Sequence, residues 1–229
     1  MLVNASKKIC ELYFYFKNSF YICKPNGRFM NDTKSYILET SFKLFLQKSF
    51  KEVTMKEIVE KTGLSKGAFY HYFESKEQLF NEIVDKYYMA FFYVDYSRFS
   101  QNNLRDFYHE YFHYAETELK SIISDLGADQ NEVVINYYLM IFDAINIYPG
   151  FKEKVKELTD HELNSWKSAV TKARERGEIK SSMTDEQITK ILVRTNDGIG
   201  LHAIMHGKMD TMIQELLDVL DGFYEEIKA

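Results

Sequence analysis

The spacing of apolar residues predicts helices along most of the chain. From residue 32 onward, apolar positions recur at intervals of three and four, and no window alternates polar with β-branched residues. Pro25 and Pro149, the only prolines, lie between the periodic segments. We therefore expect an all-α fold, with helices at about 32–47, 54–63, 65–72, 76–94, 102–124, 130–147, 151–176, 184–206 and 209–228.

Two of the predicted helices have distinctive apolar faces. The 130–147 helix is apolar on almost every face from Val133 to Ile147, so we expect it to be buried at the centre of a bundle. The last helix has a seam of apolar residues at spacings of four and three, which suits packing against another helix. The seam consists of Met209, Ile213, Leu216, Leu220, Phe223 and Ile227. Packing within the chain and an interface between two copies explain it equally well.

The second and third predicted helices have the start and stop residues of a helix-turn-helix. Thr54 can cap the first of them, and Glu57 can complete a capping box. Gly63 supplies the tight turn, and Ser65 caps the next helix. The start of that helix presents outward donors where the dipole also favours a phosphate, namely Ser65, Lys66, Gly67, Tyr70 and His71. The pattern predicts a helix that lies in a DNA groove.

The same stretch resembles the signature of the tetracycline-repressor (TetR) family. It reads Leu-Ser-Lys-Gly-Ala-Phe-Tyr-His-Tyr-Phe at 64–73 and Ser-Lys-Glu-Gln-Leu at 75–79. Tyr72 replaces the usual Phe, and Glu74 stands where Pro or Gly is common. The resemblance covers about residues 33–84. It implies a three-helix DNA-binding domain, with its helix-turn-helix at 54–72, followed by a helical ligand-binding and dimerisation domain.

The resemblance also assigns DNA contacts residue by residue. It implies phosphate contacts from Thr54, Tyr70, His71 and Lys76, and an approach to base edges by Lys66, Gly67 and Ala68. Phosphate contacts position a protein on DNA, whereas base contacts specify the sequence that it reads. With Ser65 at the helix start, these residues form the expected DNA-binding site.

By the same resemblance the chain is a homodimer, joined through the helices at 184–206 and 209–228, that represses transcription from a palindromic operator in double-stranded DNA. The half-sites would lie about 34–36 Å apart. A small-molecule effector among the helices from 102 to 206 would tilt the 76–94 helix and release the DNA. A transcriptional activator of the same fold is an alternative.

This organisation predicts a DNA-binding domain over residues 30–76 and an effector-binding and dimerisation domain over 77–229. Residues 1–29 form an N-terminal extension rich in aromatic residues. Met30 is a second candidate start, so we hypothesise that the extension comes from an overlong reading frame.

Charge and composition limit how the chain can bind nucleic acid and where in the cell it is expected. The chain has a formal net charge of −5, and residues 30–86 carry nine basic and nine acidic side chains, so any contact with nucleic acid must be local. Both cysteines, Cys10 and Cys23, lie in the extension, and no apolar run reaches the roughly 20 residues that span a bilayer. We expect a cytoplasmic protein with no membrane association and no cofactor.

A competing pattern is the HExxH sequence His109-Glu110-Tyr111-Phe112-His113, which in zinc proteases places two imidazoles on one helix face. The metal-dependent hydrolase that it suggests is a second alternative. A milder hypothesis joins His109 and His113 to His202 and His206, which are also four residues apart, in a site that binds Zn²⁺ or a similar ion as the effector. Ordinary surface or carboxylate-paired histidines explain the same pattern.

Polar and aromatic residues within the apolar helices are candidates for an effector pocket, because an unpaired polar group in a core is costly. The candidate ligand-binding residues are Phe112, His113, Tyr138, Phe142, Asn146, Trp166 and Asn196. Ordinary core packing is the alternative for each of them.

Overall fold

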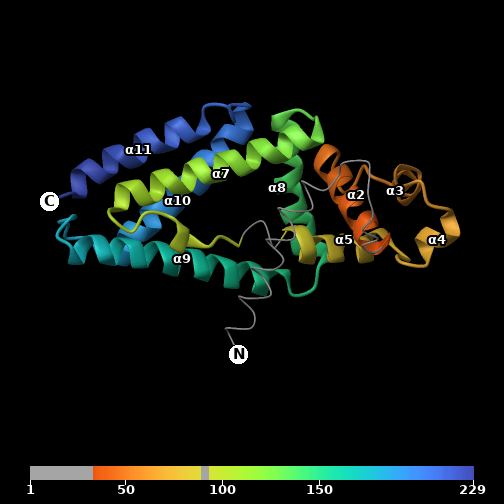
Figure 1. Ribbon diagram of the computed structural model, residues 1–229, viewed down its shortest axis with the longest axis horizontal. Helices are drawn as coiled ribbons and strands as arrows, with labels where there is room; N and C mark the ends of the chain where they lie inside the picture. Colours follow the sequence, from red (N-terminus) through yellow and green to blue (C-terminus); the bar gives the residue numbers. More distant parts are fainter. Residues whose placement is uncertain (1–32, 89–92) are drawn as a thin grey trace. The chain divides into compact units, whose positions relative to one another are not determined.

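The computed structural model describes residues 33–88 and 93–229, and these residues form helices with no strand among them (Figure 1). The α-helices are α2 (Thr33–Gln47), α3 (Met55–Thr62), α4 (Lys66–Tyr70), α5 (Lys76–Ile83), α7 (Leu104–Leu126), α8 (Gln130–Ile147), α9 (Phe151–Glu175), α10 (Asp185–His206) and α11 (Met212–Ile227). The short elements are a π-helix, η1 (Val84–Tyr88), and a 3-10 helix, η2 (Tyr96–Arg98). The all-α prediction is confirmed, whereas the expected extension at 1–29 lies outside the described residues.

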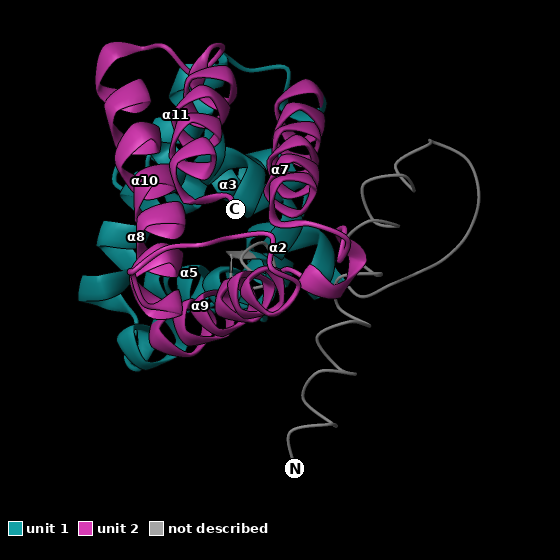
Figure 2. Cartoon of the chain, turned by 90° about the vertical axis from the view of Figure 1, so that its left-hand side faces the viewer, with its two compact units in different colours: residues 1–93, 125–155 teal, residues 94–124, 156–229 magenta. Residues whose placement is uncertain are grey.

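The chain divides into two compact units, which are coloured separately in Figure 2. Unit 1 comprises residues up to 93 together with 125–155, and unit 2 comprises residues 94–124 and 156–229. The divisions fall inside α7 and α9, so α8 belongs to the same compact unit as the helix-turn-helix. The functional domains expected over 30–76 and 77–229 are a different division and stay predictions.

Unit 1 is built around α2, which contacts α3, α5 and α8. Its core contains fully buried aromatic and aliphatic side chains, namely Ile37, Phe45, Ile58, Phe69, Phe73 and Phe80. One buried polar side chain joins two of these helices, because the Asn136 amide of α8 donates to the carbonyl oxygen of Leu46 at 3.0 Å. That bond satisfies a carbonyl at the end of α2 that has no partner within its own helix.

The helix α8 is not buried on every face, contrary to the prediction. Its inner face packs on α2 and α5 through Val133, Val134, Met140 and Ala144. Its other face leaves Phe142 59% exposed, together with Ile135, Leu139 and Ile145, each 40% exposed. The apolar pattern predicts burial on every side, but α2 and α5 together cover only one face of α8.

The long helix predicted over 76–94 is also different in the structure. Ser75 caps it by accepting from the backbone N–H of Gln78 at 3.0 Å. The α-helical geometry ends at Ile83 and continues as the π-helix η1. On η1 the carboxylate of Asp85 accepts hydrogen bonds from Lys154 and from the hydroxyl of Tyr148. These contacts hold the widened turn against the α8–α9 connection within unit 1.

Unit 2 has a core rich in aromatic rings that surrounds Trp166 of α9. The indole is 1% exposed and meets Phe107, Tyr111 and Phe112 of α7 at ring-centroid distances of 5.2, 5.4 and 5.8 Å. The α10 helix begins with a full capping box, in which Thr184 and Gln187 exchange hydrogen bonds. The C-terminal end of α11 closes against residues 178–180, where Lys180 N–H donates to Ile227 O at 2.7 Å. None of the described helices is long and apolar enough to cross a membrane.

One acidic side chain lies at the edge of this aromatic core. The hydroxyl of Tyr96 donates to the carboxylate of Glu162 at 3.4 Å. Burial disfavours the charged form, and the negative charge of Asp197 adds to this effect, so the pKa of Glu162 is raised to about 7. Arg194 opposes the rise only in part, because its guanidinium pairs with Asp197 at 2.9 Å. Ionised Glu162 therefore opposes folding.

This raised pKa predicts how stability depends on pH. The folded protein holds the Glu162 proton more tightly than the unfolded chain does, so the stability present below pH 4.5 is lost as the pH rises through about 7. The loss is about 3 kcal/mol at most. Glu162→Gln should remove it, and urea unfolding at pH 5 and pH 8 measures it. Glu157→Gln, at an exposed position of α9, is the control. Equal pH dependence in both variants would contradict the prediction.

Candidate nucleic-acid interface

The first helix of the helix-turn-helix, α3, begins at a side-chain cap. Thr54 has an extended backbone, with φ −106° and ψ 154°, and its hydroxyl oxygen accepts from the N–H of Glu57 at 3.2 Å. The predicted capping box is only half formed. The Glu57 carboxylate accepts instead from the Lys48 ammonium at 2.5 Å, because an ammonium attracts a carboxylate more strongly than a neutral N–H does.

The turn between α3 and α4 requires Gly63. Its φ of 67° lies in the left-handed region that disfavours a side chain, and its N–H donates to Glu60 O at 3.2 Å. Beneath the turn, Ile58 of α3 and Phe69 of α4 are fully buried. The glycine and these two side chains fix the angle at which α4 leaves the turn.

The second helix of the motif, α4, presents its outer edge to solvent. Ser65 caps it by accepting from the N–H of Ala68 at 3.2 Å, and the helix ends at Tyr70 rather than at the predicted residue 72. The residues predicted to contact DNA are exposed along this edge, namely Ser65, Lys66, Gly67, Ala68, Tyr70 and His71, as is Thr54 at the start of α3. Every predicted DNA contact except half-buried Lys76 is thus exposed to solvent.

Two details of the edge bear on what it can bind. The ammonium of Lys66 lies 5.8 Å from the centre of the Tyr70 ring, so a cation lies beside an aromatic ring. A Cβ added at Gly67 would meet nothing within 4 Å, and the φ of Gly67 is not in the left-handed region. The fold itself therefore does not require glycine at this position.

Lys76 has a structural role that the sequence did not reveal. Its ammonium donates to the carbonyl oxygens of Phe50 and Val53, at 2.8 and 2.9 Å, and lies 4.3 Å from the centre of the Phe50 ring. These bonds tie the start of α5 to the loop before α3. The predicted phosphate contact of Lys76 stays a prediction, since two of its three N–H donors are used within the chain.

Comparisons with known proteins agree with this geometry. Residues 37–83 match the profile of bacterial regulatory proteins of the tetR family. The chain is 50% identical to YerO of Bacillus subtilis, a transcriptional regulator of the helix-turn-helix type, over 50 residues, which are 22% of this chain and 17% of that protein. It is 34% identical to the transcriptional repressor NemR of Escherichia coli K12 over 61 residues, or 27% and 31% of the two chains. The matches to these two relatives thus cover less than a third of their length.

Longer matches extend the likeness beyond the helix-turn-helix. The repressor BepR of Brucella suis is 23% identical over 202 residues, which are 81% of this chain and 92% of that protein. The crystal structure of reduced E. coli NemR superposes with a TM-score of 0.60 and 21% identity, covering 87% of this chain and 99% of that one. Residues 37–83 thus have the sequence of a tetR-type DNA-binding domain, and the longer likeness shows that most of the chain shares the fold of these solved regulators.

The predicted ligand-binding residues fall into two groups. Phe112 and Trp166 meet in the core of unit 2. Half-buried Asn196 and exposed His113 belong to the same unit, and His113 bonds the carbonyl of His109 in its own helix. The other three, Tyr138, Phe142 and Asn146, belong to unit 1. Asn146 is exposed and donates to the carbonyl of Phe142 at 2.9 Å, so its side chain does not require a ligand to satisfy its hydrogen bonds.

Sequence reasoning missed Tyr96 and Glu162 as polar groups of the unit 2 core. One signal was available for Glu162, because it lies four residues before Trp166 and therefore shares its helix face. No local signal marked Tyr96, which lies in a short 3-10 helix between longer elements.

The histidines of the HExxH pattern are engaged within unit 2. His109 Nε2 lies 2.8 Å from the carboxylate of Asp221, and Glu110 accepts from the N–H of Ser100 at 2.6 Å. His202 and His206 lie beside each other, with ring centres 5.5 Å apart. The described residues contain no group of three or more His, Cys, Asp or Glu side chains that could hold a metal ion. Within the described residues, the two histidine pairs do not come together as a metal site.

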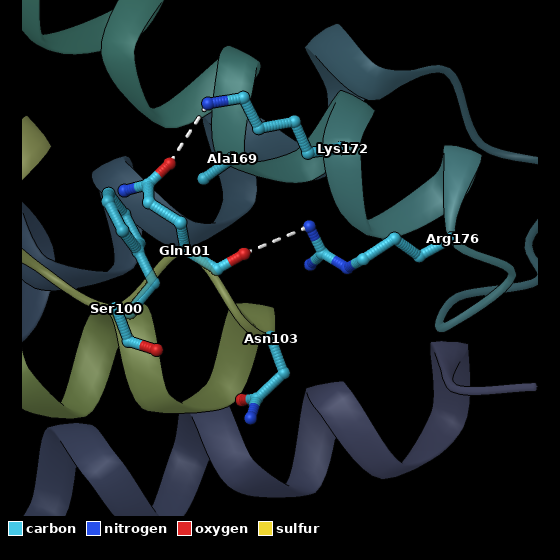
Figure 3. A pocket seen from close by; sticks show the side chains of 7 residues that line it. Ser100, Gln101, Asn103, Ala169, Lys172 and Arg176 are labelled. Atoms are coloured by element: carbon cyan, nitrogen blue, oxygen red, sulfur yellow. Dashed lines mark hydrogen bonds between the residues drawn. The ribbon is translucent and has the colours of Figure 1, made fainter.

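A pocket in unit 2 is lined mainly by polar side chains, and its two cationic side chains, Lys172 and Arg176, are bonded to other groups of the chain (Figure 3). Lys172 donates to the side-chain oxygen of Gln101 at 2.9 Å, and Arg176 donates to its carbonyl oxygen at 3.2 Å. A second guanidinium nitrogen of Arg176 pairs with Glu178 at 2.6 Å. These bonds fasten the loop before α7 to α9.

The contacts of Lys76 predict a loss of stability on substitution. Lys76→Met keeps most of the alkyl stem but leaves the Phe50 and Val53 carbonyls without their charged donor, which should lower the free energy of unfolding by about 1–3 kcal/mol. Urea unfolding of the purified protein measures the change. Lys56→Met is the control, because that side chain is 87% exposed. Equal stability of the two variants would show that the hydrogen bonds from Lys76 to the two carbonyls do not stabilise the fold.

Proposed function

We propose that this chain is a transcriptional repressor that binds double-stranded operator DNA through α4 and is released by a small-molecule effector. The single observation that carries the proposal is the exposed edge of α4. A helix N-terminus, a lysine, a tyrosine hydroxyl and an unobstructed glycine face solvent together while the opposite side of the helix is anchored by Phe69.

The chemistry of this edge suits DNA. The N–H groups at the start of a helix and the hydroxyls of Thr54 and Tyr70 can donate to phosphate oxygens. Lys66 can reach the acceptors on a guanine edge. At Gly67 the absence of a side chain lets the backbone approach the groove. DNA binding would therefore explain a glycine at this position, which the fold does not require.

Affinity would depend on these few contacts and not on a broad basic surface. Residues 30–86 have equal numbers of acidic and basic side chains, and the chain as a whole is acidic. Two α4 helices presented by a dimer would double the contacts and read a palindrome. Because the relatives NemR and BepR are named as repressors, we favour repression over activation. Action on chromosomal DNA also favours a cytoplasmic location.

The proposed dimer uses the outer faces of α10 and α11. The apolar seam predicted along α11 packs mainly inside unit 2, where Leu216, Leu220 and Ile227 are buried. Other large apolar side chains remain on the surface of the same two helices, with Leu201 48%, Met205 61% and Val219 49% exposed. Apolar residues on neighbouring exposed faces are typical of an interface between subunits.

The effector is proposed to bind within unit 2 without a metal or another cofactor. A solved relative from Saccharomonospora viridis, which superposes with a TM-score of 0.60 and 14% identity, was crystallised in complex with choline. This precedent supports a small organic effector for the fold.

The role of α4 predicts a selective loss of DNA binding. Lys66→Ala should weaken binding to the DNA upstream of the protein's own gene by tenfold or more, because a good contact to one base is worth about 1–3 kcal/mol. Fluorescence anisotropy with a labelled duplex measures the dissociation constant. Gly67→Ala should weaken binding as well while leaving thermal stability unchanged or slightly higher, since alanine favours a helix.

The matched control is Lys56→Ala, which removes one exposed positive charge from α3. It should change the dissociation constant severalfold at most. If Lys66→Ala and Lys56→Ala weakened binding equally, α4 would not be the reading helix.

The dimer proposal predicts that a charge on the α10–α11 face separates the subunits. Met205→Asp with Val219→Asp should shift the protein toward the monomer mass of 27.1 kDa in sedimentation equilibrium, because an aspartate cannot be buried unpaired in an apolar contact. Phe142→Asp places the same charge on an exposed apolar position of α8 and should leave the dimer intact. A dimer that survives the α10–α11 substitutions but not Phe142→Asp would place the interface on α8.

A further inference from the structure

Two polar groups at the edge of the unit 2 core lack a full set of partners among the described residues. Glu162 is half-buried, and no cationic side chain among the described residues pairs with its carboxylate. The indole N–H of Trp166 is buried and near the Tyr96 hydroxyl, yet it forms no hydrogen bond of good geometry. Burying a donor without an acceptor, or a carboxylate without a cation, lowers the free energy of unfolding. The presence of both groups at one place therefore calls for a functional explanation.

Aromatic rings surround the same carboxylate. Tyr96, which donates to Glu162, has its ring centre 5.4 Å from that of Tyr111 and 5.9 Å from that of His161. Tyr111 in turn meets the edge of Trp166 at 5.4 Å. Faces of electron-rich rings attract a positive charge, and they cover apolar groups at the same time.

Charges on the neighbouring elements leave the site negative. Beyond the effect of burial, Asp197 on α10 raises the pKa of Glu162, and Arg194, which pairs with Asp197, lowers it by less. Tyr96 on η2 and Tyr111 on α7 are uncharged phenols. On α9 itself, the Nε2 atom of His161 lies 3.1 Å from the carbonyl oxygen of Val94. Ionised Glu162 is therefore the uncompensated charge of this cluster.

We infer that Tyr96, Tyr111, Glu162 and Trp166 form the binding site of an organic cation, an ammonium group carried on an apolar body. The carboxylate pairs with the ammonium, the phenol rings of Tyr96 and Tyr111 cover its apolar substituents, and the Trp166 N–H is free for an acceptor on the ligand. As the effector site, this assignment rests on the proposed function, but cation binding itself needs no DNA to be measured.

The chain provides its own reporter, because Trp166 is its only tryptophan. Titration of the full-length protein with benzyltrimethylammonium at pH 8 should change the indole fluorescence saturably, whereas benzyl alcohol, a neutral aromatic probe, should bind at least tenfold more weakly. Glu162→Gln should weaken binding of the cation at least tenfold. Glu157→Gln removes a carboxylate from an exposed position of the same helix and should leave the affinity unchanged.

The pH dependence gives a second readout. Binding should weaken about tenfold from pH 8 to pH 6 as Glu162, whose pKa is about 7, takes up a proton. Glu162→Gln should abolish this dependence, and His161→Gln should retain it, which separates the carboxylate from the nearby imidazole.

Several results would overturn the inference: no saturable change in fluorescence, equal affinity for the cation and the alcohol, or equal affinity of wild type and Glu162→Gln. Anisotropy measurements on upstream DNA keep the two proposals apart. Normal DNA binding with no cation binding would refute the site alone. Cation binding that depends on Glu162, in a protein that does not bind DNA, would refute the repressor and leave the cation site standing.

Discussion

The burial of Phe69 is the interaction on which the proposed DNA-reading edge of α4 depends. The helix α4 has only five residues, far fewer than a helix needs to persist alone in water. It exists because Ser65 caps its start and because Phe69, fully buried, anchors its inner side to the core of unit 1. The same anchor turns Lys66 and Tyr70 outward. Packing on one side of a single turn of helix thus fixes the chemistry that the other side offers.

Local signals explain why so much of the fold could be predicted from the sequence. The caps at Thr54, Ser65 and Ser75 and the left-handed turn at Gly63 each depend on residues within three or four positions, and all four are present in the structure. The partner of a side chain far along the chain is a different matter. Lys76 bonds carbonyls 23 and 26 residues away, and no spacing rule indicates that an exposed-looking lysine will fold back in this manner.

Burial was predicted less well than helix position, for a related reason. Periodicity indicates that a side chain avoids water, not which surface covers it. The helix α8 is apolar on nearly all faces, yet unit 1 uses only the side that meets α2 and α5, whereas the apolar seam of α11 is absorbed mainly into the core of unit 2. Two similar apolar patterns therefore have opposite outcomes, and only the tertiary neighbours decide between them.

The aromatic core of unit 2 shows how stability and recognition oppose each other in one place. Filling the Glu162 position with an uncharged side chain, and giving the Trp166 N–H an acceptor, would remove two penalties at once. A core selected for stability alone has no reason to keep both. The proposed cation would bind best to a conformation in which the carboxylate is ionised and the rings of Tyr96 and Tyr111 face the ligand. A ligand shifts a conformational equilibrium only through its different affinities for the two states, so under this proposal the charge of Glu162 would be the source of the effector's control.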